Sequence, residues 1–174
     1  MLLPAEWEAA PFYRLQFPDS QAGRLCSHPL GDGLQSLVYE SEDGLGPVLD
    51  KVLPSHRIIP DACLMARYVL AESREIATLL AWQAADRLQL FVASEGRLLF
   101  ANAFQATDDS QRNYHILNVH REFGQPKRLV LAGPTAPVLP IDDRVLTPFF
   151  EQVVCLDAFA DIHRLLDVYQ NASL

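Results

Sequence analysis

The chain has little of what most binding and catalytic chemistries require. Its 174 residues include only 8 glycines and 3 cysteines, and 14 basic residues face 22 acidic ones, so the formal net charge is −8. Such a negative chain disfavours non-specific binding to nucleic-acid phosphates or to anionic lipid. No apolar run approaches the ~20 residues of a membrane span. We therefore expect neither nucleic-acid binding nor membrane insertion.

The cysteines and the first residues bear on the cellular compartment. Cys26, Cys63 and Cys155 are odd in number and widely spaced, and Cys155 has apolar neighbours. We expect buried thiols that form no disulfide, which indicates a reducing compartment. Met1–Pro4 has no basic region and is followed at once by Glu6, so it does not resemble a signal peptide. These features predict a cytoplasmic protein.

Motifs that carry catalytic or metal chemistry are also missing. The sequence has no Gly-x-Ser-x-Gly elbow, no Walker loop and no dinucleotide-binding fingerprint. His115 and His120 are five residues apart on one predicted helix, which places them on different faces and not on the stripe of a zinc site. The other histidines, His28, His56 and His163, have no cysteine or acidic partner at ligand spacing. We expect no metal site.

What the sequence does contain is a series of short apolar segments in its second half. Ile76–Trp82, Leu88–Ser94 and Leu98–Phe104 are separated by only a few residues, a spacing that fits hairpins better than crossovers. Asp108–Phe123 has a capping aspartate and a helical apolar pattern, and Arg128–Ala132 is a buried strand. Because the meander strands are almost continuously apolar, we expect a sheet covered on both faces.

Helices and strands alternate through the rest of this half. We predict a helix at Asp143–Phe150, a strand at Gln152–Leu156 and a last helix that begins at Asp157, which gives the order βββαβαβα. The predicted core includes Leu90, Val92, Leu99, Leu117, Val130 and Leu131. Trp7, Trp82 and the pair Phe149–Phe150 fit a core better than a ligand cage.

The first seventy residues are less regular. Pro4–Phe17 has a weak helical pattern, and Arg24–Pro29 and Leu34–Glu40 look like strands around an Asp-Gly turn. A helix at Asp43–Leu53, a short strand at Arg57–Ile59 and a helix at Pro60–Leu70 follow. Ala71–Glu75 consists of charged and small residues, so it is the best candidate for a domain boundary. The predicted domains are therefore residues 1–74 and 75–174.

Three segments carry a resemblance to a known family: Leu98–Phe104, Asn113–Leu117 and Leu129–Gly133. Together they resemble an uncharacterised family of bacterial proteins, mostly from Bacteroidetes, known only as a domain of unknown function. The resemblance implies an α/β fold of the ribonuclease H-like (actin-like ATPase) type, in which helices flank a mixed sheet. It implies no activity, because the family has no established reaction.

Members of that family carry a further N-terminal three-stranded meander, whereas this sequence begins after the place where it would lie. The resemblance therefore implies a partial first ribonuclease H-like lobe at residues 1–74 and a complete second lobe at residues 75–174. A partial lobe would leave a sheet edge open, most readily at Arg24–Pro29 and Leu34–Glu40. We expect self-association or a protein partner at that edge, and a two-fold dimer is the favoured form.

The same resemblance bears on whether the chain could bind a nucleotide. Actin-like ATPases hold phosphates in glycine-bearing hairpin turns, but the matching turn of the second lobe, Gln83–Arg87, has no glycine. Gly133 falls where these folds place a glycine pair under the adenosine, and Pro134 replaces the second glycine and removes its N–H donor. Gly133 and Pro134 are the candidate nucleotide-binding residues. A plain strand-to-helix turn is the competing explanation.

Nuclease chemistry has no support. A ribonuclease H-like nuclease needs an aspartate in its first strand, so that two metal ions can lie ~4 Å apart, and Ile76–Trp82 contains no acid. Asp108 and Asp109 are explained by helix capping. We expect no catalytic residue, no metal and no cofactor.

The predicted function is that of a non-catalytic interaction or scaffold protein with a degenerate actin-like fold. The main alternative is a nucleotide-binding, ATP-binding or ATP-hydrolysing enzyme with an atypical phosphate clamp. A further alternative is an obligate subunit whose open sheet edge pairs with another chain.

Overall fold

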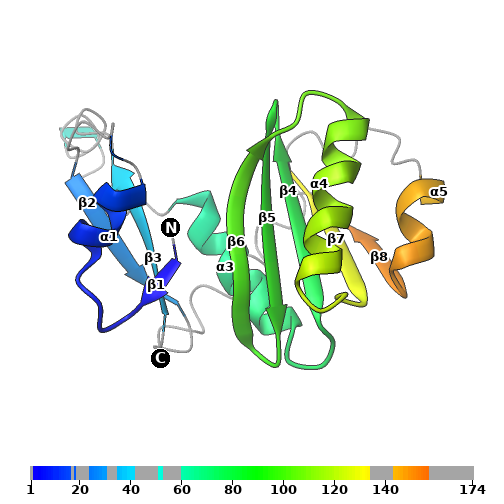
Figure 1. The fold of residues 1–174 in the computed structure, drawn as a ribbon, viewed down its shortest axis with the longest axis horizontal. Helices are drawn as coiled ribbons and strands as arrows, with labels where there is room; N and C mark the ends of the chain where they lie inside the picture. Colours follow the sequence, from blue (N-terminus) through cyan, green and yellow to red (C-terminus); the bar gives the residue numbers. More distant parts are fainter. Residues whose placement is uncertain are drawn as a thin grey trace. The chain divides into compact units, whose positions relative to one another are not determined.

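The computed structural model describes residues 2–16, 18, 24–30, 35–41, 51–52, 60–133 and 143–156. The chain divides into two compact units, Met1–Cys63 and Leu64–Leu174, whose elements are labelled in Figure 1. The division falls earlier than Ala71–Glu75, because most of the helix before that segment belongs to the second unit. The assignment of the first unit as a partial ribonuclease H-like lobe stays a prediction.

A three-stranded antiparallel sheet forms the centre of the first unit. Its strands are β1 (Leu2–Pro4), β2 (Arg24–Pro29) and β3 (Gln35–Ser41), in the order β1-β3-β2, and α1 (Ala9–Gln16) connects β1 to β2. The predicted pairing of Arg24–Pro29 with Leu34–Glu40 is confirmed. The expectation of an open edge is wrong for Gln35–Leu37, because Leu2–Pro4 pairs with that side of β3, but Arg24–Pro29 is an edge strand of the described sheet.

The predicted helix at Pro4–Phe17 begins only at Ala9, since the preceding residues form β1 and a turn. Pro11 is tolerated because it lies in the first helical turn, where its missing N–H is not needed. Trp7 is exposed and stacks on Phe12 with 4.7 Å between ring centroids, so its assignment to the core is wrong. The predicted Asp43–Leu53 helix lies outside the described residues except at positions 51 and 52, which are helical, and the Arg57–Ile59 strand lies wholly outside.

The second unit is built on a five-stranded mixed sheet in the order β6-β5-β4-β7-β8. The strands are β4 (Thr78–Ala84), β5 (Arg87–Ser94), β6 (Arg97–Gln105), β7 (Arg128–Ala132) and β8 (Gln152–Cys155). β4, β5 and β6 form the predicted antiparallel meander, whereas β7 lies parallel to β4 and β8 parallel to β7. The crossover from β6 to β7 is α4 (Asp109–Glu122), and the crossover from β7 to β8 contains α5 (Asp143–Leu146) and the 3-10 helix η1 (Thr147–Phe149).

One face of this sheet packs against α4. Leu79, Leu90 and Leu129 on three neighbouring strands join Ile116 of α4 and Leu146 of α5 in a single buried cluster. In Figure 1, α4 lies in front of the sheet and α3 (Asp61–Glu72) runs behind it. Side chains alternate between the two faces of a strand. The strand residues that come between members of this buried cluster along the chain therefore lie on the side of α3. Buried residues on that side are Met65, Ala66 and Val69 of α3 and Leu80, Phe91 and Val130 of the strands.

β6 departs from the expected pattern. Most of β5 is buried, but in β6 only Leu98 is buried and the other residues are exposed or half-buried, so the sheet is not covered on both faces at this edge. Leu99, a predicted core residue, is 47% exposed. The register passes from Val92 opposite Phe100 to Ala93 opposite Leu98, which leaves Leu99 as the extra residue of a β-bulge.

Four of the five other core predictions are confirmed, and the fifth, Leu117, is correct only in part. Leu90, Val92, Val130 and Leu131 are buried, and Leu117 is half-buried against the α4 cluster.

Two further predictions, both near the end of the described residues, differ from the structure. The predicted helix at Asp143–Phe150 changes to a 3-10 turn at Thr147, because Pro148 cannot donate the backbone hydrogen bond that an α-helix needs. Phe150 is buried but Phe149 is 52% exposed, so only one of the pair belongs to the core. The helix predicted from Asp157 lies outside the described residues.

The cysteines and the helices add two observations. Cys63 is buried and Cys26 is partly buried, but Cys155 is exposed on the edge strand β8, which contradicts the expectation of three buried thiols. Within the described ranges, none of the helices combines the length and the apolar composition needed to cross a bilayer.

Candidate functional site

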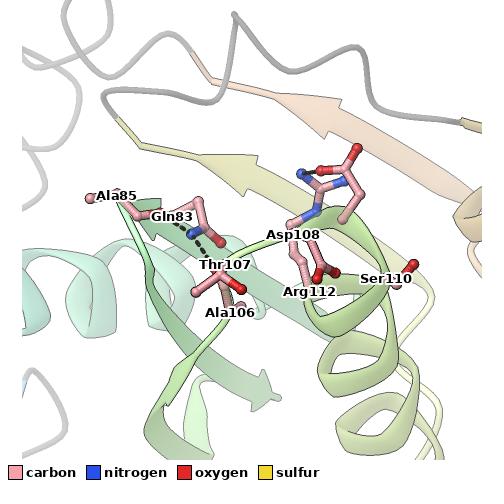
Figure 2. Close-up of a pocket in the computed structure, with 8 residues that line it drawn as sticks. Gln83, Ala85, Ala106, Thr107, Asp108, Ser110 and Arg112 are labelled. Carbon is pink, nitrogen blue, oxygen red and sulfur yellow. Dashed lines mark hydrogen bonds and ion pairs between the residues drawn. The ribbon is translucent and has the colours of Figure 1, made fainter.

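The carboxyl ends of β4 and β7 lie at one end of the sheet, which is where open α/β sheets commonly bind ligands. A pocket of about 540 Å³ opens here, between the β4–β5 turn and the first turn of α4 (Figure 2). Its lining residues are Gln83, Ala85, Ala106, Thr107, Asp108, Asp109, Ser110 and Arg112. This is the candidate site that the actin-like resemblance implies for phosphate binding.

The β4–β5 turn holds itself in place through Gln83. The Gln83 side-chain amide donates to the carbonyl oxygen of Ala85 at 2.6 Å and to that of Ala106 at 3.3 Å, as the dashed lines in Figure 2 show. The backbone N–H of Ala106 donates in turn to the Asp86 carbonyl at 2.7 Å. Ala85 has φ 51°, a conformation that glycine adopts more readily. In these contacts the carbonyl oxygens of Ala85 and Asp86 are acceptors, of the Gln83 side chain and of the Ala106 backbone N–H respectively.

The start of α4 is capped by its own residues. Asp108 accepts a hydrogen bond from the Gln111 backbone N–H at 2.8 Å, which confirms the predicted capping role. The Gln111 side-chain oxygen accepts from the Thr107 backbone N–H at 3.1 Å. A helix N-terminus binds an anion through N–H groups of this kind. In this protein the Asp108 carboxylate already accepts one of these N–H groups, so part of the anion position is occupied.

The charges around the pocket do not favour a phosphate. Asp109 forms an ion pair with Arg112 at 2.9 Å between carboxylate and guanidinium, and the Arg112 side chain is only 6% exposed. The Asp108 carboxylate has no such cationic partner among the lining residues, so the two carboxylates and the one guanidinium sum to one negative charge. Coulomb repulsion at this rim therefore opposes a phosphate.

Gly133 has a packing role that needs no ligand. It ends β7 with φ +135°, and a Cβ built on it would lie 2.0 Å from the Gln83 carbonyl oxygen. Only glycine fits this close approach of two backbones. Gly133 is not among the described lining residues of the pocket, and Pro134 lies outside the described residues. Their role at an adenosine site stays a prediction.

The two histidines of α4 lie on different faces, as predicted. The His115 ring stacks on Phe104 with 4.5 Å between centroids, and the His120 ring contacts Phe150 edge-on at 4.7 Å. Burial lowers the pKa of His120 below its ordinary value, and a hydrogen bond with the Phe149 backbone opposes this effect. The described residues contain no group of three or more histidine, cysteine and acidic side chains that could hold a metal ion.

A second hollow was missed by the sequence reasoning. It has a volume of about 610 Å³, lies between α4 and η1, and is bordered by Tyr114, which is 65% exposed, and by the exposed Phe149. The signal was available in part, because Tyr114 lies outside the apolar stripe of the predicted helix. Phe149 was instead assigned to the core. The remaining lining residues are Leu117, Asn118, His120, Arg121, Gln125 and Pro148.

Comparisons with known proteins agree with the fold and leave the chemistry open. A family model described as "Protein of unknown function (DUF3822)" matches residues 4–127. A search of curated proteins gives no match.

A crystal structure of a Bacteroides thetaiotaomicron protein, described as having an actin-like ATPase fold and unknown function, is similar to this chain. The TM-score is 0.71 and the identity 21%, over 90% of this chain and 64% of that one. The chain thus spans less than two thirds of the length of that protein.

The PilM–PilN type IV pilus biogenesis complex gives a TM-score of 0.47 and 10% identity over 97% of this chain and 70% of the matched one, which is too distant to assign a fold. The resemblance to an uncharacterised bacterial family is confirmed by the family model, which covers more than half of the chain. With its mixed sheet and flanking helices, the chain has an actin-like ATPase fold and belongs to the DUF3822 family of proteins of unknown function.

Proposed function

We propose that this protein is a non-catalytic interaction module that keeps an actin-like fold without an actin-like phosphate clamp. One observation carries the proposal. At the end of the sheet where this fold would hold phosphates, the pocket presents the Asp108 and Asp109 carboxylates, and Asp108 already caps the helix that faces it.

Electrostatic reasoning gives this observation its weight. Phosphate sites in proteins combine backbone N–H donors with cationic side chains or a bound cation. Here Arg112 is paired with Asp109, and the Gln83 side chain holds the glycine-free β4–β5 turn in place. An arriving phosphate would have to displace a capping carboxylate and separate an ion pair.

Exposed apolar groups support the interaction part of the proposal. Tyr114 and Phe149 border one hollow, and Leu99 protrudes from the edge strand β6. An exposed hollow bordered by two large aromatic side chains, Tyr114 and Phe149, is typical of protein-binding sites.

Binding of Mg·ATP tests the proposal directly. We expect the free energy of unfolding, measured by urea titration, to be the same with and without millimolar Mg·ATP or Mg·ADP. A ligand present at a hundred times its dissociation constant would add ~2.7 kcal/mol. Phosphate release should equal a no-protein control with ATP and with RNA·DNA hybrids.

Two outcomes would contradict the proposal. A saturable stabilisation of the parent chain by Mg·ATP would support the alternative of an atypical nucleotide clamp. Phosphate release above the control that is lost in Asp86→Ala would support an ATP-hydrolysing enzyme.

A further inference from the structure

β6 is an open edge of the second sheet. In the described part of the chain it pairs on one side only, with β5. It is nine residues long, whereas the opposite edge strand β8 has four. Natural proteins usually protect a long edge with lysine, proline, a β-bulge or a covering segment. β6 has a bulge at Leu99, but Phe100–Phe104 beyond it pairs regularly with β5. Between Arg97 and Gln105 the strand has no proline and no lysine, and Arg97 is its one charged residue.

The backbone groups of β6 show which residues face outward. The Ala103 N–H donates to the side-chain oxygen of its exposed neighbour Asn102 at 2.9 Å. This N–H therefore points away from β5. Because backbone groups alternate in direction along an antiparallel strand, the groups of Ala101 face the same way. The edge thus presents outward hydrogen-bonding residues at alternate positions.

We propose that β6 pairs antiparallel with β6 of a second copy of this chain, about a two-fold axis that passes beside Asn102. In this register Ala101 of each strand lies opposite Ala103 of the other, and both present their backbone groups across the interface. Two sheets then become one continuous sheet. The bulge at Leu99 limits regular pairing to Phe100–Phe104.

The side chains favour this register over its neighbours. It places Phe100 opposite Phe104 of the second copy, and aromatic cross-strand pairs are among the favourable ones. Both rings are half-buried and already belong to an aromatic row: Phe100 contacts Phe123, and Phe104 contacts His115, each at 4.5 Å between centroids. An axis at Ala101 would instead oppose Phe100 with an asparagine.

Charge also supports a second copy as the occupant. The paired segment contains no acidic residue, so the pairing itself brings no two carboxylates together, although each chain has a net charge of −8. In the antiparallel arrangement, the Arg97 end of one strand lies near the Gln105 end of the other. The exposed Asp108 follows shortly after Gln105 in the chain. Each interface forms this contact twice, as an isologous dimer does.

The inference deepens the proposed function by naming a partner, and it is tested separately from nucleotide binding. Analytical ultracentrifugation of the full chain over a micromolar dilution series should show a reversible monomer–dimer equilibrium. Asn102→Lys and Asn102→Asp each place like charges together at the axis, so each variant alone should dissociate at least tenfold more readily. An equimolar mixture of the two should dimerise again. Gln152→Lys, an exposed change on the opposite edge strand β8, is the control and should leave the equilibrium unchanged.

Restoration in the mixture would also show that both variants are folded. A strictly monomeric parent chain, a dimer that is indifferent to both charged variants, or a mixture that stays monomeric would each overturn the pairing. None of these results depends on whether Mg·ATP stabilises the protein, so the two proposals can fail independently.

Discussion

Gly133 lies against the backbone of Gln83, where an added Cβ would come within 2.0 Å of the Gln83 carbonyl oxygen. The neighbouring atoms are backbone atoms of β4, which cannot move aside without disturbing its pairing with β7. This contact explains the glycine by strand packing.

Gly133→Ala should therefore be strongly destabilising. We expect a loss of roughly 2–4 kcal/mol in the free energy of unfolding, because overpacking and a strained positive φ each cost about 1–3 kcal/mol. Gly124 is the matched control, since it also has a positive φ but nothing within 4 Å of an added Cβ. Gly124→Ala should cost only ~1 kcal/mol. Similar losses in urea denaturation of the two variants would contradict the close approach.

The bulge in β6 predicts different responses of two leucines on neighbouring strands. Leu90→Ala should cost about 2–5 kcal/mol, because Leu90 is wholly buried in the α4 cluster. Leu99→Ala should lower the free energy of unfolding by only about 1 kcal/mol, since Leu99 is 47% exposed and loses only a partly buried side chain. Chemical denaturation measures both, and equal losses would mean that Leu99 packs in the core after all.

The cap of α4 should contribute measurably to stability. Asp108→Ala is expected to cost about 0.5–2 kcal/mol, because the Gln111 N–H loses its acceptor. Asp108→Asn keeps an acceptor and should cost much less. Ser110→Ala, in the same exposed first turn, serves as a control for local propensity. If the Asn and Ala variants lose the same amount, the cap is not formed as described.

His120 predicts a loss of stability in acid. Its pKa in the folded protein lies below the ordinary value of 6.5, chiefly because the ring is buried. As pH falls through 6.5 the unfolded chain takes up a proton that the folded chain does not, so stability decreases until the lower folded pKa is reached. Urea titrations at pH 7.5 and 5.5 should show a smaller decrease for His120→Gln than for the parent chain. An identical decrease in both proteins would assign the acid sensitivity to other groups.

The sequence predicted the second unit better than the first for a physical reason. The meander, α4 and β7 have local signals, namely short turns, a capping aspartate and unbroken apolar strands, and these survive packing. The strand Leu2–Pro4 has no such signal, because three residues acquire strand geometry only by pairing with β3. This strand covers Gln35–Leu37 of β3, which is part of the edge at which self-association was expected, whereas Arg24–Pro29 is still an edge strand in the described part of the chain.

The candidate site was predictable in composition but not in arrangement. The absence of glycine from Gln83–Arg87 and the capping role of Asp108 are properties of neighbouring residues. The Gln83 contact with Ala106 and the close approach of Gly133 join distant segments, so no local pattern reveals them. The exposure of Leu99 follows from one extra residue in the register of β6, which apolar composition cannot show.

α3 determines where this chain can be divided. It lies on the first-domain side of the boundary suggested by composition, yet its ion pair between Glu72 and Arg128 of β7 and its buried face attach it to the second sheet. A fragment that begins at residue 75 would leave Leu80, Phe91 and Val130 without their cover and would expose an apolar sheet face to water. A fragment intended to fold alone must begin at or before Asp61.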